Sequence, residues 1–226
     1  VPGQPSGPTK ASDLVSVRVM ADTEAVSPGE TFHVAVVFDI KDKWHTYWIN
    51  PGSSGAPTSV KTTAPAGFEV GAMRFPRPWT HQDNVGVTYG YEKQVAHFIP
   101  VSAPQNLSSG EATFNLNIFY LVCQDRCLMG REQASITLPT MPTEDRGSAN
   151  RTVASTGSPE DTELLKQFKG RLPQPIDRLD AGRARLDGAT LIIEGQAGEH
   201  GEAVAFLPID RPGVSYGEAE TTVKAD

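Results

Sequence analysis

The 226-residue chain contains only two cysteines, Cys123 and Cys127, which stand four positions apart. This excludes a disulfide-rich scaffold, and two cysteines alone leave the compartment open, although a disulfide would favour an oxidising one. Long apolar runs are missing, so we expect no membrane-spanning helix and no membrane insertion of this fragment. Runs of Lys and Arg are also missing and the formal net charge is −7, which argues against a nucleic-acid binder.

The patterns of common catalytic and metal sites are absent as well. The five histidines are scattered and form neither an HxxxH nor an HExxH pattern, and no phosphate loop or Ser/His/Asp triad stands out. We therefore predict no cofactor and no metal. One alternative stays open: Cys123, Cys127, Met129 and a histidine are a set that would suit Cu(I), because soft sulfur ligands bind that ion.

Glycine and proline are abundant, with 21 and 18 residues, which favours turns and short strands over long helices. Residues 31–40 alternate cleanly, as a half-buried strand does. Residues 111–123 and 134–138 alternate in the same way, and we expect further strands near 14–20 and 94–101. Many short strands separated by turns predict an all-β protein, an antiparallel β-sandwich. The residues expected on one face are Phe32, Val34, Val36, Phe38 and Ile40 in the first strand and Phe114, Leu116, Ile118 and Tyr120 in the second.

Composition divides the chain into four parts. Residues 1–11 are a flexible lead-in without a signal peptide, which we expect to be a mature or trimmed N-terminus. Residues 12–140 form the sandwich, and the polar stretch 141–158 is a linker. Residues 159–226 form a second, smaller β-rich unit with a short helix, either complete or cut short.

The expected helix follows residue 158. Ser158 is its N-cap, Pro159 suits the first turn, Asp161 completes a capping box and Gly170 ends it. Its buried side is predicted to carry Leu164, Leu165 and Phe168. Two strands are then expected, in ATLIIEG and AVAFLPID.

The spacing of the two cysteines constrains their geometry. Residues four apart in a straight strand are separated by roughly 13 Å, whereas a disulfide spans Cα separations of at most about 7 Å. If the pair bridges, the chain must bend within residues 124–126. The flanking patterns are strand-like, so we predict a hairpin tip there, with Cys123 and Cys127 facing each other across its neck.

Such a disulfide would contribute little to the stability of the fold. It closes a very small loop and contributes on the order of 2 kcal/mol in the chain-entropy model, in a place where a hairpin already holds the strands. This favours a redox role, yet a local structural disulfide or two idle thiols remain alternatives. No helix begins at the pair, unlike a thioredoxin CxxC site. Arg126 and Arg131 favour a thiolate, Asp125 opposes it, and His45 in the aromatic block is a further candidate for tuning the pair.

Four stretches in order resemble one family: WHTYWINPGSSGAPT, PAGFEVGAMRFPRP, YGYEKQVAHFIPV and FYLVCQDRCL. Together they resemble the periplasmic N-terminal (α) domain of the DsbD/ScsB transmembrane thiol:disulfide reductases, over roughly residues 12–140. The WHTYW…NPG block and the close cysteines are more similar to the ScsB branch. ScsB-like proteins carry a larger N-terminal region, which fits the second unit, and they are linked to copper tolerance.

The resemblance implies an immunoglobulin-like sandwich that acts as a protein-disulfide reductase relay in the periplasm, as the soluble part of an inner-membrane protein. Electrons would arrive from the thioredoxin-like γ domain, fed through the transmembrane domain of the same reductase. They would leave to thioredoxin-fold substrate proteins in the periplasm. By position, Cys127 matches the cysteine that forms the mixed disulfide with partners, and Cys123 matches the resolving cysteine. A plain immunoglobulin-like interaction module with a structural disulfide is the alternative.

The family also shields its cysteines with a cap loop that bears an aromatic residue. By position this loop falls near residues 83–91, and Tyr89 is the expected shield with Tyr91 beside it. The residue before Tyr89 departs from the DsbD pattern, because Thr88 stands where that family has phenylalanine. Tyr89 and Tyr91 would otherwise pack against the sandwich.

Overall fold

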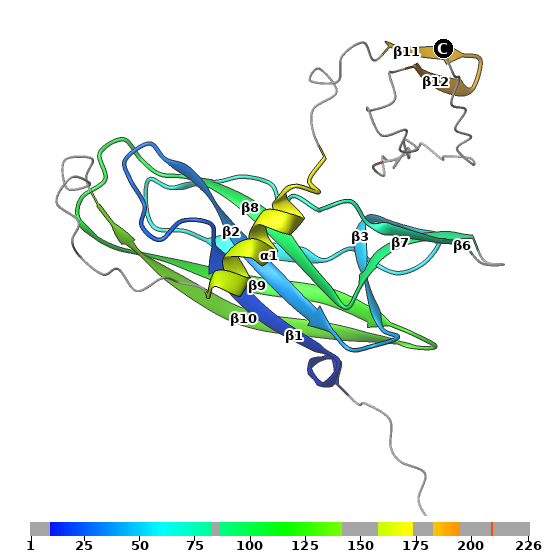
Figure 1. Cartoon of the computed structure of the whole chain (residues 1–226), viewed down its shortest axis with the longest axis horizontal. Helices are drawn as coiled ribbons and strands as arrows, with labels where there is room; N and C mark the ends of the chain where they lie inside the picture. Colours follow the sequence, from blue (N-terminus) through cyan, green and yellow to red (C-terminus); the bar gives the residue numbers. More distant parts are fainter. Residues whose placement is uncertain (1–9, 83–85, 142–157, 174–182, 195–208, 210–226) are drawn as a thin grey trace, which may run out of the picture. The chain divides into compact units, whose positions relative to one another are not determined.

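The computed structural model describes residues 10–82, 86–141, 158–173, 183–194 and 209 of the chain. β-Strands dominate these residues and short turns or loops join them (Figure 1). The chain divides into two compact units, Val1–Leu172 and Pro173–Asp226. The first unit holds the sandwich and both cysteines.

One sheet of the first unit has four strands in the order β1-β2-β8-β5. All of its neighbouring pairs are antiparallel. A 3-10 helix, η1 (Ala11–Asp13), precedes the first strand. The strands are β1 (Val15–Ala21), β2 (Thr31–Ile40), β8 (Gln94–Ser102) and β5 (Glu69–Val70).

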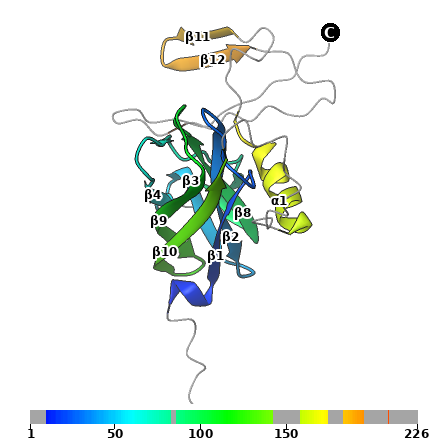
Figure 2. The ribbon, with the colours of Figure 1, turned by 90° about the vertical axis from the view of Figure 1, so that its left-hand side faces the viewer.

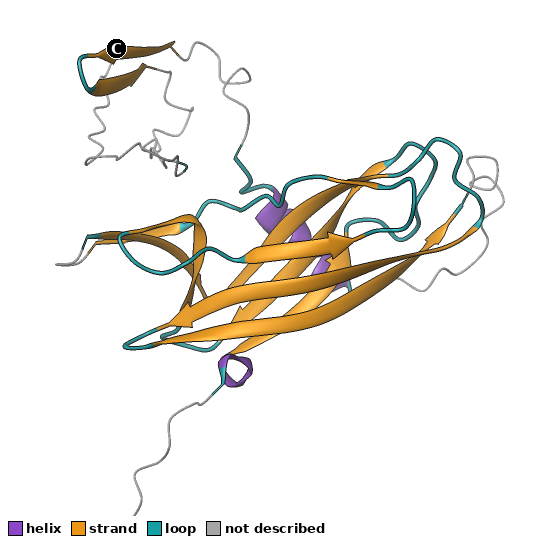
Figure 3. Ribbon diagram, turned by 180° about the vertical axis from the view of Figure 1, so that it is seen from behind, coloured by secondary structure: helices purple, strands orange, loops and turns teal. Residues whose placement is uncertain are grey.

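The other sheet has six strands, in the order β10-β9-β3-β7-β6, with β4 also paired to β9. Its longest part is the β9–β10 hairpin, which runs along one side of the sandwich (Figure 3). The strands are β10 (Cys127–Thr140), β9 (Gly110–Cys123), β3 (His45–Gly52), β7 (Val87–Glu92), β6 (Trp79–Gln82) and β4 (Ser59–Thr63).

The two sheets pack face to face through aromatic side chains. Phe32 of β2 meets Phe114 of β9 with ring centroids 5.7 Å apart, and Phe38 meets Tyr120 at 5.4 Å. All four belong to the faces that the alternating pattern assigned to the core, because successive side chains of a strand point to opposite faces. The predicted antiparallel β-sandwich is confirmed.

β2 is buried on both faces, whereas its sequence pattern predicts a half-buried strand. Ala35 and Val37, on the face away from the core, are fully buried, and so are their β8 partners Phe98 and Ala96. The cause is the helix α1 (Pro159–Lys169), which packs against β8 and covers this outer face (Figure 2). The alternation of β2 could not reveal a cover supplied by residues far along the chain.

α1 itself begins and ends as predicted. The Ser158 hydroxyl accepts a hydrogen bond from the Asp161 backbone N–H, and the Asp161 carboxylate accepts one from the Ser158 backbone N–H. This is the predicted capping box, with Pro159 in the first turn and Gly170 at the C-cap. Of the three apolar residues expected on the buried side, Leu165 and Phe168 are buried and Leu164 is half-buried.

The helix belongs to the sandwich unit and not to the second unit, to which the sequence analysis assigned it. Asp161 forms an ion pair with Arg18 of β1 at 2.7 Å, and Lys169 forms one with Asp22 at 2.6 Å. The boundary between the compact units accordingly falls after Leu172, and not at residue 159. The sequence pattern shows which face of the helix is apolar, but it does not show which sheet that face covers.

In the second unit, β11 (Arg183–Asp187) pairs with β12 (Thr190–Glu194) as an antiparallel hairpin. β12 coincides with the expected strand in ATLIIEG. The other expected strand, residues 203–210, lies outside the described residues except for Ile209, as do most of the lead-in and the linker.

Within the described part of the chain, no helix has the length and apolar character needed to cross a membrane.

Candidate functional site

The two cysteines lie at the neck of the β9–β10 hairpin. Cys123 ends β9, Cys127 begins β10, and the strand register pairs them directly. They form a disulfide with a Cα–Cα separation of 4.1 Å, near the roughly 4.5 Å of a non-hydrogen-bonded antiparallel pair. The hairpin tip at residues 124–126 and the facing cysteines confirm the geometry that the spacing predicted.

The two halves of the disulfide differ in exposure. Cys123 is only 2% exposed, because it lies inside the sheet between β10 and β3. Cys127 is exposed, because β10 stands at the end of the strand order. Thiol–disulfide exchange depends on access to the sulfur that is attacked, so this arrangement presents Cys127 to an incoming thiolate and protects Cys123.

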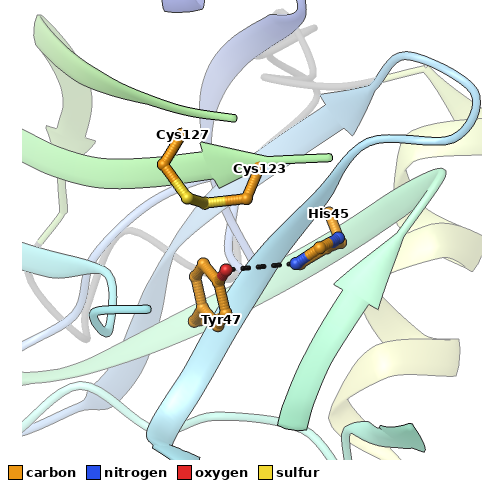
Figure 4. The surroundings of a disulfide bond; sticks show 4 residues. All are labelled: His45, Tyr47, Cys123 and Cys127. Carbon is orange, nitrogen blue, oxygen red and sulfur yellow. Dashed lines mark hydrogen bonds between the residues drawn. A yellow bond between two sulfur atoms is a disulfide. The ribbon is translucent and has the colours of Figure 1, made fainter. Parts of the chain in front are cut away.

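A histidine and a tyrosine lie beside the buried cysteine (Figure 4). His45 of β3 is the direct register partner of Cys123 across the sheet. Its Nε2 is 3.1 Å from the Tyr47 hydroxyl, at hydrogen-bond distance. The two rings meet edge to face with centroids 5.1 Å apart, and the Trp79 ring also meets His45 edge to face, with centroids 5.7 Å apart.

Partial burial shifts both titrating groups of this cluster. Burial lowers the pKa of His45; the charge of His81 lowers it further, and Glu92 opposes the shift. Burial raises the pKa of Tyr47 above its ordinary value, against a hydrogen bond with Ser54. At neutral pH the imidazole is therefore uncharged and the phenol keeps its proton.

The loop of residues 53–57 covers Tyr47. Tyr47 is only 2% exposed although the loop itself is exposed. Gly55 lies flat on the tyrosine ring, since a Cβ there would come within 2.2 Å of ring atoms, and its φ of +94° also favours glycine. The Ser53 N–H donates to the Val87 carbonyl at 2.8 Å and ties the loop to β7.

Tyr89 and Tyr91, the expected shield and its neighbour, lie on the opposite face of β7 from this cluster. Gly90 is paired with Tyr47, so the residues on either side of it point the other way. Tyr91 is 4% exposed and donates its hydroxyl to the Pro76 carbonyl at 2.6 Å, a core position. The Tyr89 ring meets Trp48. Within the described residues, which omit 83–85, Tyr47 and not Tyr89 adjoins the disulfide.

The sequence did not lead us to place Tyr47 near the cysteines. One signal was available: Tyr47 stands two positions from His45, so both share one face of a strand. Which strand would lie beside that face could not be known, because the pairing of His45 with Cys123 joins residues far apart in the chain.

An apolar strip continues from the disulfide along the outer face of the hairpin. Met129 lies opposite Leu121, and Arg131 lies opposite Phe119. These four side chains are on the same face of the hairpin as the two cysteines, because alternate residues of a strand share a face. Met129 is 67% exposed and Phe119 39%. The Arg131 guanidinium stacks over the Phe119 ring at 5.3 Å and its Nη2 contacts the Met129 sulfur at 3.9 Å. Exposed apolar side chains of this kind are typical of binding surfaces.

The charged candidates Asp125 and Arg126 are both exposed at the tip of the hairpin. Both belong to the turn that joins Cys123 of β9 to Cys127 of β10. In the described part of the chain, no group of three or more His, Cys, Asp or Glu side chains is arranged to hold a metal ion.

Residues 12–139 match the family model described as "Thiol:disulfide interchange protein DsbD, N-terminal". The chain belongs to this family. The match covers more than half of the 226 residues and confirms the resemblance drawn from the four sequence stretches. Membership in the DsbD N-terminal family, together with the cysteine disulfide, fits a thiol:disulfide interchange domain. No curated protein sequence matches the chain.

Among solved structures, the N-terminal periplasmic domain of ScsB from Proteus mirabilis aligns with a TM-score of 0.51 and 15% identity. The alignment covers 81% of this chain and 64% of the ScsB chain. The reduced DsbD N-terminal domain of Neisseria meningitidis aligns with a TM-score of 0.33 and 17% identity, over 57% of this chain and 93% of that one. The likeness to the ScsB domain concerns the fold, and the predicted immunoglobulin-like sandwich is confirmed.

Proposed function

We propose that this chain is the electron-relay domain of a protein-disulfide reductase, with Cys123 and Cys127 as its catalytic pair. The observation that carries the proposal is the family match over residues 12–139 combined with a hairpin disulfide that has one exposed and one buried cysteine. A purely structural bridge has no need of this asymmetry. A structural bridge at this place would also add little to the stability of the fold, because the hairpin already aligns the two cysteines.

The proposed reaction has two halves. A thiolate of a reduced donor attacks the Cys127 sulfur, the Cys123–Cys127 bond breaks, and Cys123 leaves with the electron pair. The second donor thiol then releases the donor as a disulfide and leaves both cysteines of the chain reduced. In the other half, the Cys127 thiolate attacks a substrate disulfide, and Cys123 resolves the mixed disulfide and releases the reduced substrate.

The partners follow from the same proposal. The donor is a thioredoxin-like domain of the same reductase, supplied through its transmembrane domain, and the acceptors are thioredoxin-fold proteins. We place the reaction in the periplasm, at the inner membrane. The name of the ScsB domain, which is periplasmic, supports this compartment. Asp125 and Arg126 are proposed to tune the pair from the hairpin tip.

The strip formed by Phe119, Leu121, Met129 and Arg131 supports a protein as the exchange partner. It lies on the same hairpin face as the disulfide, and its exposed apolar atoms are available for a partner that reaches Cys127. Redox partners that must separate after each turnover use small contact areas, and a strip beside one sulfur fits that requirement.

The decisive experiment measures reduction of the disulfide by reduced thioredoxin, used as a probe, and by dithiothreitol. A relay domain is expected to react much faster with the protein than with the small dithiol. The Cys123→Ala variant should displace thionitrobenzoate from a thioredoxin that lacks its resolving cysteine and carries this group on its remaining cysteine, and the mixed disulfide on Cys127 should then persist. The matched Cys127→Ala variant should trap none, because its remaining thiol is buried.

The competing function is an interaction module with a structural disulfide. It predicts that both reductants react slowly, that the protein has no advantage over the small dithiol, and that the two single-cysteine variants are equally inert. That result would overturn the relay.

A further inference from the structure

The relay requires a buried thiol to ionise. Resolution of the mixed disulfide begins when Cys123 becomes a thiolate, since only the thiolate attacks. A thiol in water has a pKa of about 8.5, and burial in apolar surroundings raises it. Cys123 is only 2% exposed, so bulk water is a poor acceptor for its proton and a group inside the sheet has to serve.

The cluster next to Cys123 offers such a group. His45 faces Cys123 directly across β3 and β9, and side chains in that relation have Cβ atoms roughly 4.5–5.5 Å apart. The Tyr47 hydroxyl lies on the same side of the disulfide, and in the view of Figure 4 it stands between the sulfurs and the imidazole. Its 3.1 Å contact with Nε2 and the flat cover of Gly55 hold it there.

The protonation states of the cluster suit proton transfer to the imidazole. Burial keeps the Tyr47 phenol protonated, so that residue can pass a proton on but cannot be the resting base. Burial also keeps His45 uncharged at neutral pH, with a ring nitrogen able to accept. The other charged groups around His45 are Glu92 opposite it on β7 and His81 on β6. The turn between the two cysteines also carries the charged residues Asp125 and Arg126, both of which are exposed.

We propose that His45, linked through the Tyr47 hydroxyl, accepts the proton of the Cys123 thiol when Cys123 resolves the mixed disulfide. This inference rests on the relay function proposed above. In the step, the thiol proton passes to the Tyr47 oxygen as the Tyr47 proton passes to Nε2. The Cys123 sulfur forms a bond to the Cys127 sulfur, and the partner leaves as a thiolate with the electron pair of the broken bond. In the reverse direction the protonated imidazole returns the proton to the Cys123 thiolate.

One equivalent of 5,5′-dithiobis(2-nitrobenzoate) separates this step from the first one. Reduced protein should release a first thionitrobenzoate anion as Cys127 attacks the reagent, and a second as Cys123 closes the disulfide. Cys123→Ala should give the first phase alone. His45→Gln keeps the size and polarity of the site but removes the titrating group, and it should slow the second phase at least about tenfold at neutral pH, at the lower end of general-base effects, with an unchanged first phase.

The pH profile distinguishes proton transfer from a structural role. In the wild type, the second phase should reach a plateau once His45 is neutral. In His45→Gln it should keep rising with pH as the thiol ionises unaided, so the two rates converge at high pH. Tyr47→Phe, which loses only the hydroxyl, should resemble His45→Gln. His81→Gln is the matched control: it should keep the plateau and move its midpoint upward, because the charge of His81 lowers the pKa of His45.

Equal slowing of both phases in His45→Gln, or a second phase with the wild-type pH profile, would overturn the inference. The relay function is judged separately by the thioredoxin experiment on the wild type. If thioredoxin reduces the wild type rapidly while His45→Gln retains the plateau, the relay stands and His45 is only a packing residue. If thioredoxin has no advantage over dithiothreitol, the relay itself fails.

Discussion

The outer faces of the two sheets differ in how far they are covered. The four-stranded sheet is closed on both sides, with aromatic core packing on one face and α1 on the other. The six-stranded sheet leaves the outer face of its hairpin open, and Met129 and Phe119 are exposed there on the same face as Cys127. Burial of apolar surface stabilises a fold, whereas neighbouring apolar side chains that stay exposed are a feature of interaction surfaces. The closed sheet therefore serves as a support, and the open hairpin face is the surface on which we propose that partners dock.

The largest effect is expected from opening the closed sheet. Phe168 of α1 is 5% exposed, and Phe168→Ala should lower the free energy of unfolding by about 3–5 kcal/mol, the usual cost of removing a buried phenylalanine. Urea unfolding measures this change. Reduction of the disulfide by dithiothreitol should stay the same, because α1 lies on the other sheet. Glu163→Ala, on the exposed side of the same helix, should change stability by less than about 0.5 kcal/mol; a similar loss in both variants would mean that α1 is not a cover.

A buried histidine of the closed sheet, His97, should make the stability of the protein sensitive to acid. His97 is fully buried between Phe38, Phe75 and Tyr91, and neither ring nitrogen has a hydrogen-bond partner among the described residues. Burial lowers the pKa of His97 from 6.5 to about 3. Below about 6.5 the unfolded chain therefore binds a proton that the folded chain does not. Stability should fall as the pH drops from 6.5 towards 3, by up to roughly 1.4 kcal/mol per pH unit.

Unfolding free energies measured across this window test the assignment. His97→Leu should flatten the dependence, whereas His81→Gln, an exposed histidine, should leave it intact. A slope that survives in His97→Leu would assign the acid sensitivity to other groups. Asp22 is not a strong candidate above pH 4, because hydrogen bonds from His33 and Lys169 outweigh its burial and hold its pKa at about 2.

On the open face, a substitution should affect exchange and not stability. Met129→Glu places a charge in the exposed strip and should slow reduction by thioredoxin about fivefold, a loss of roughly 1 kcal/mol in the encounter. Reduction by dithiothreitol and the unfolding midpoint should both stay near wild type. Thr137→Glu, at the far end of the same face, is the companion variant and should leave both rates unchanged. Equal slowing with both reductants would place Met129 in the chemistry of the disulfide instead of in a docking surface.

The smallest effect is expected where the closed sheet meets solvent. Arg18 bridges Asp39 at 3.1 Å and Asp161 at 2.7 Å, and its side chain is 40% exposed. Arg18→Gln should cost about 0.2–1 kcal/mol, because water screens partly exposed ion pairs. The difference from wild type should shrink in high salt. A salt-independent loss of several kcal/mol would show that this contact, and not apolar burial, holds α1 in place.

The sequence by itself determined the features that depend on neighbours along the chain. Alternation in β2 and β9 predicted the strands and the core face, since a strand has a period of two. The capping residues Ser158 and Asp161 predicted the start of α1. The four-residue spacing of Cys123 and Cys127 predicted the hairpin bend, because a disulfide cannot span a straight strand of that length.

Only the tertiary structure decided which surfaces meet. In the folded chain, α1 packs on the outer face of β8, and His45 lies beside Cys123. Tyr47 lies on the same side of β3 as His45, near the disulfide, whereas Tyr89 points to the opposite face of its sheet. Each of these depends on the pairing of strands and the packing of layers between residues far apart in the chain. Local periodicity shows which face of an element is apolar. Any complementary apolar surface could bury that face, so the packing partner depends on the whole fold.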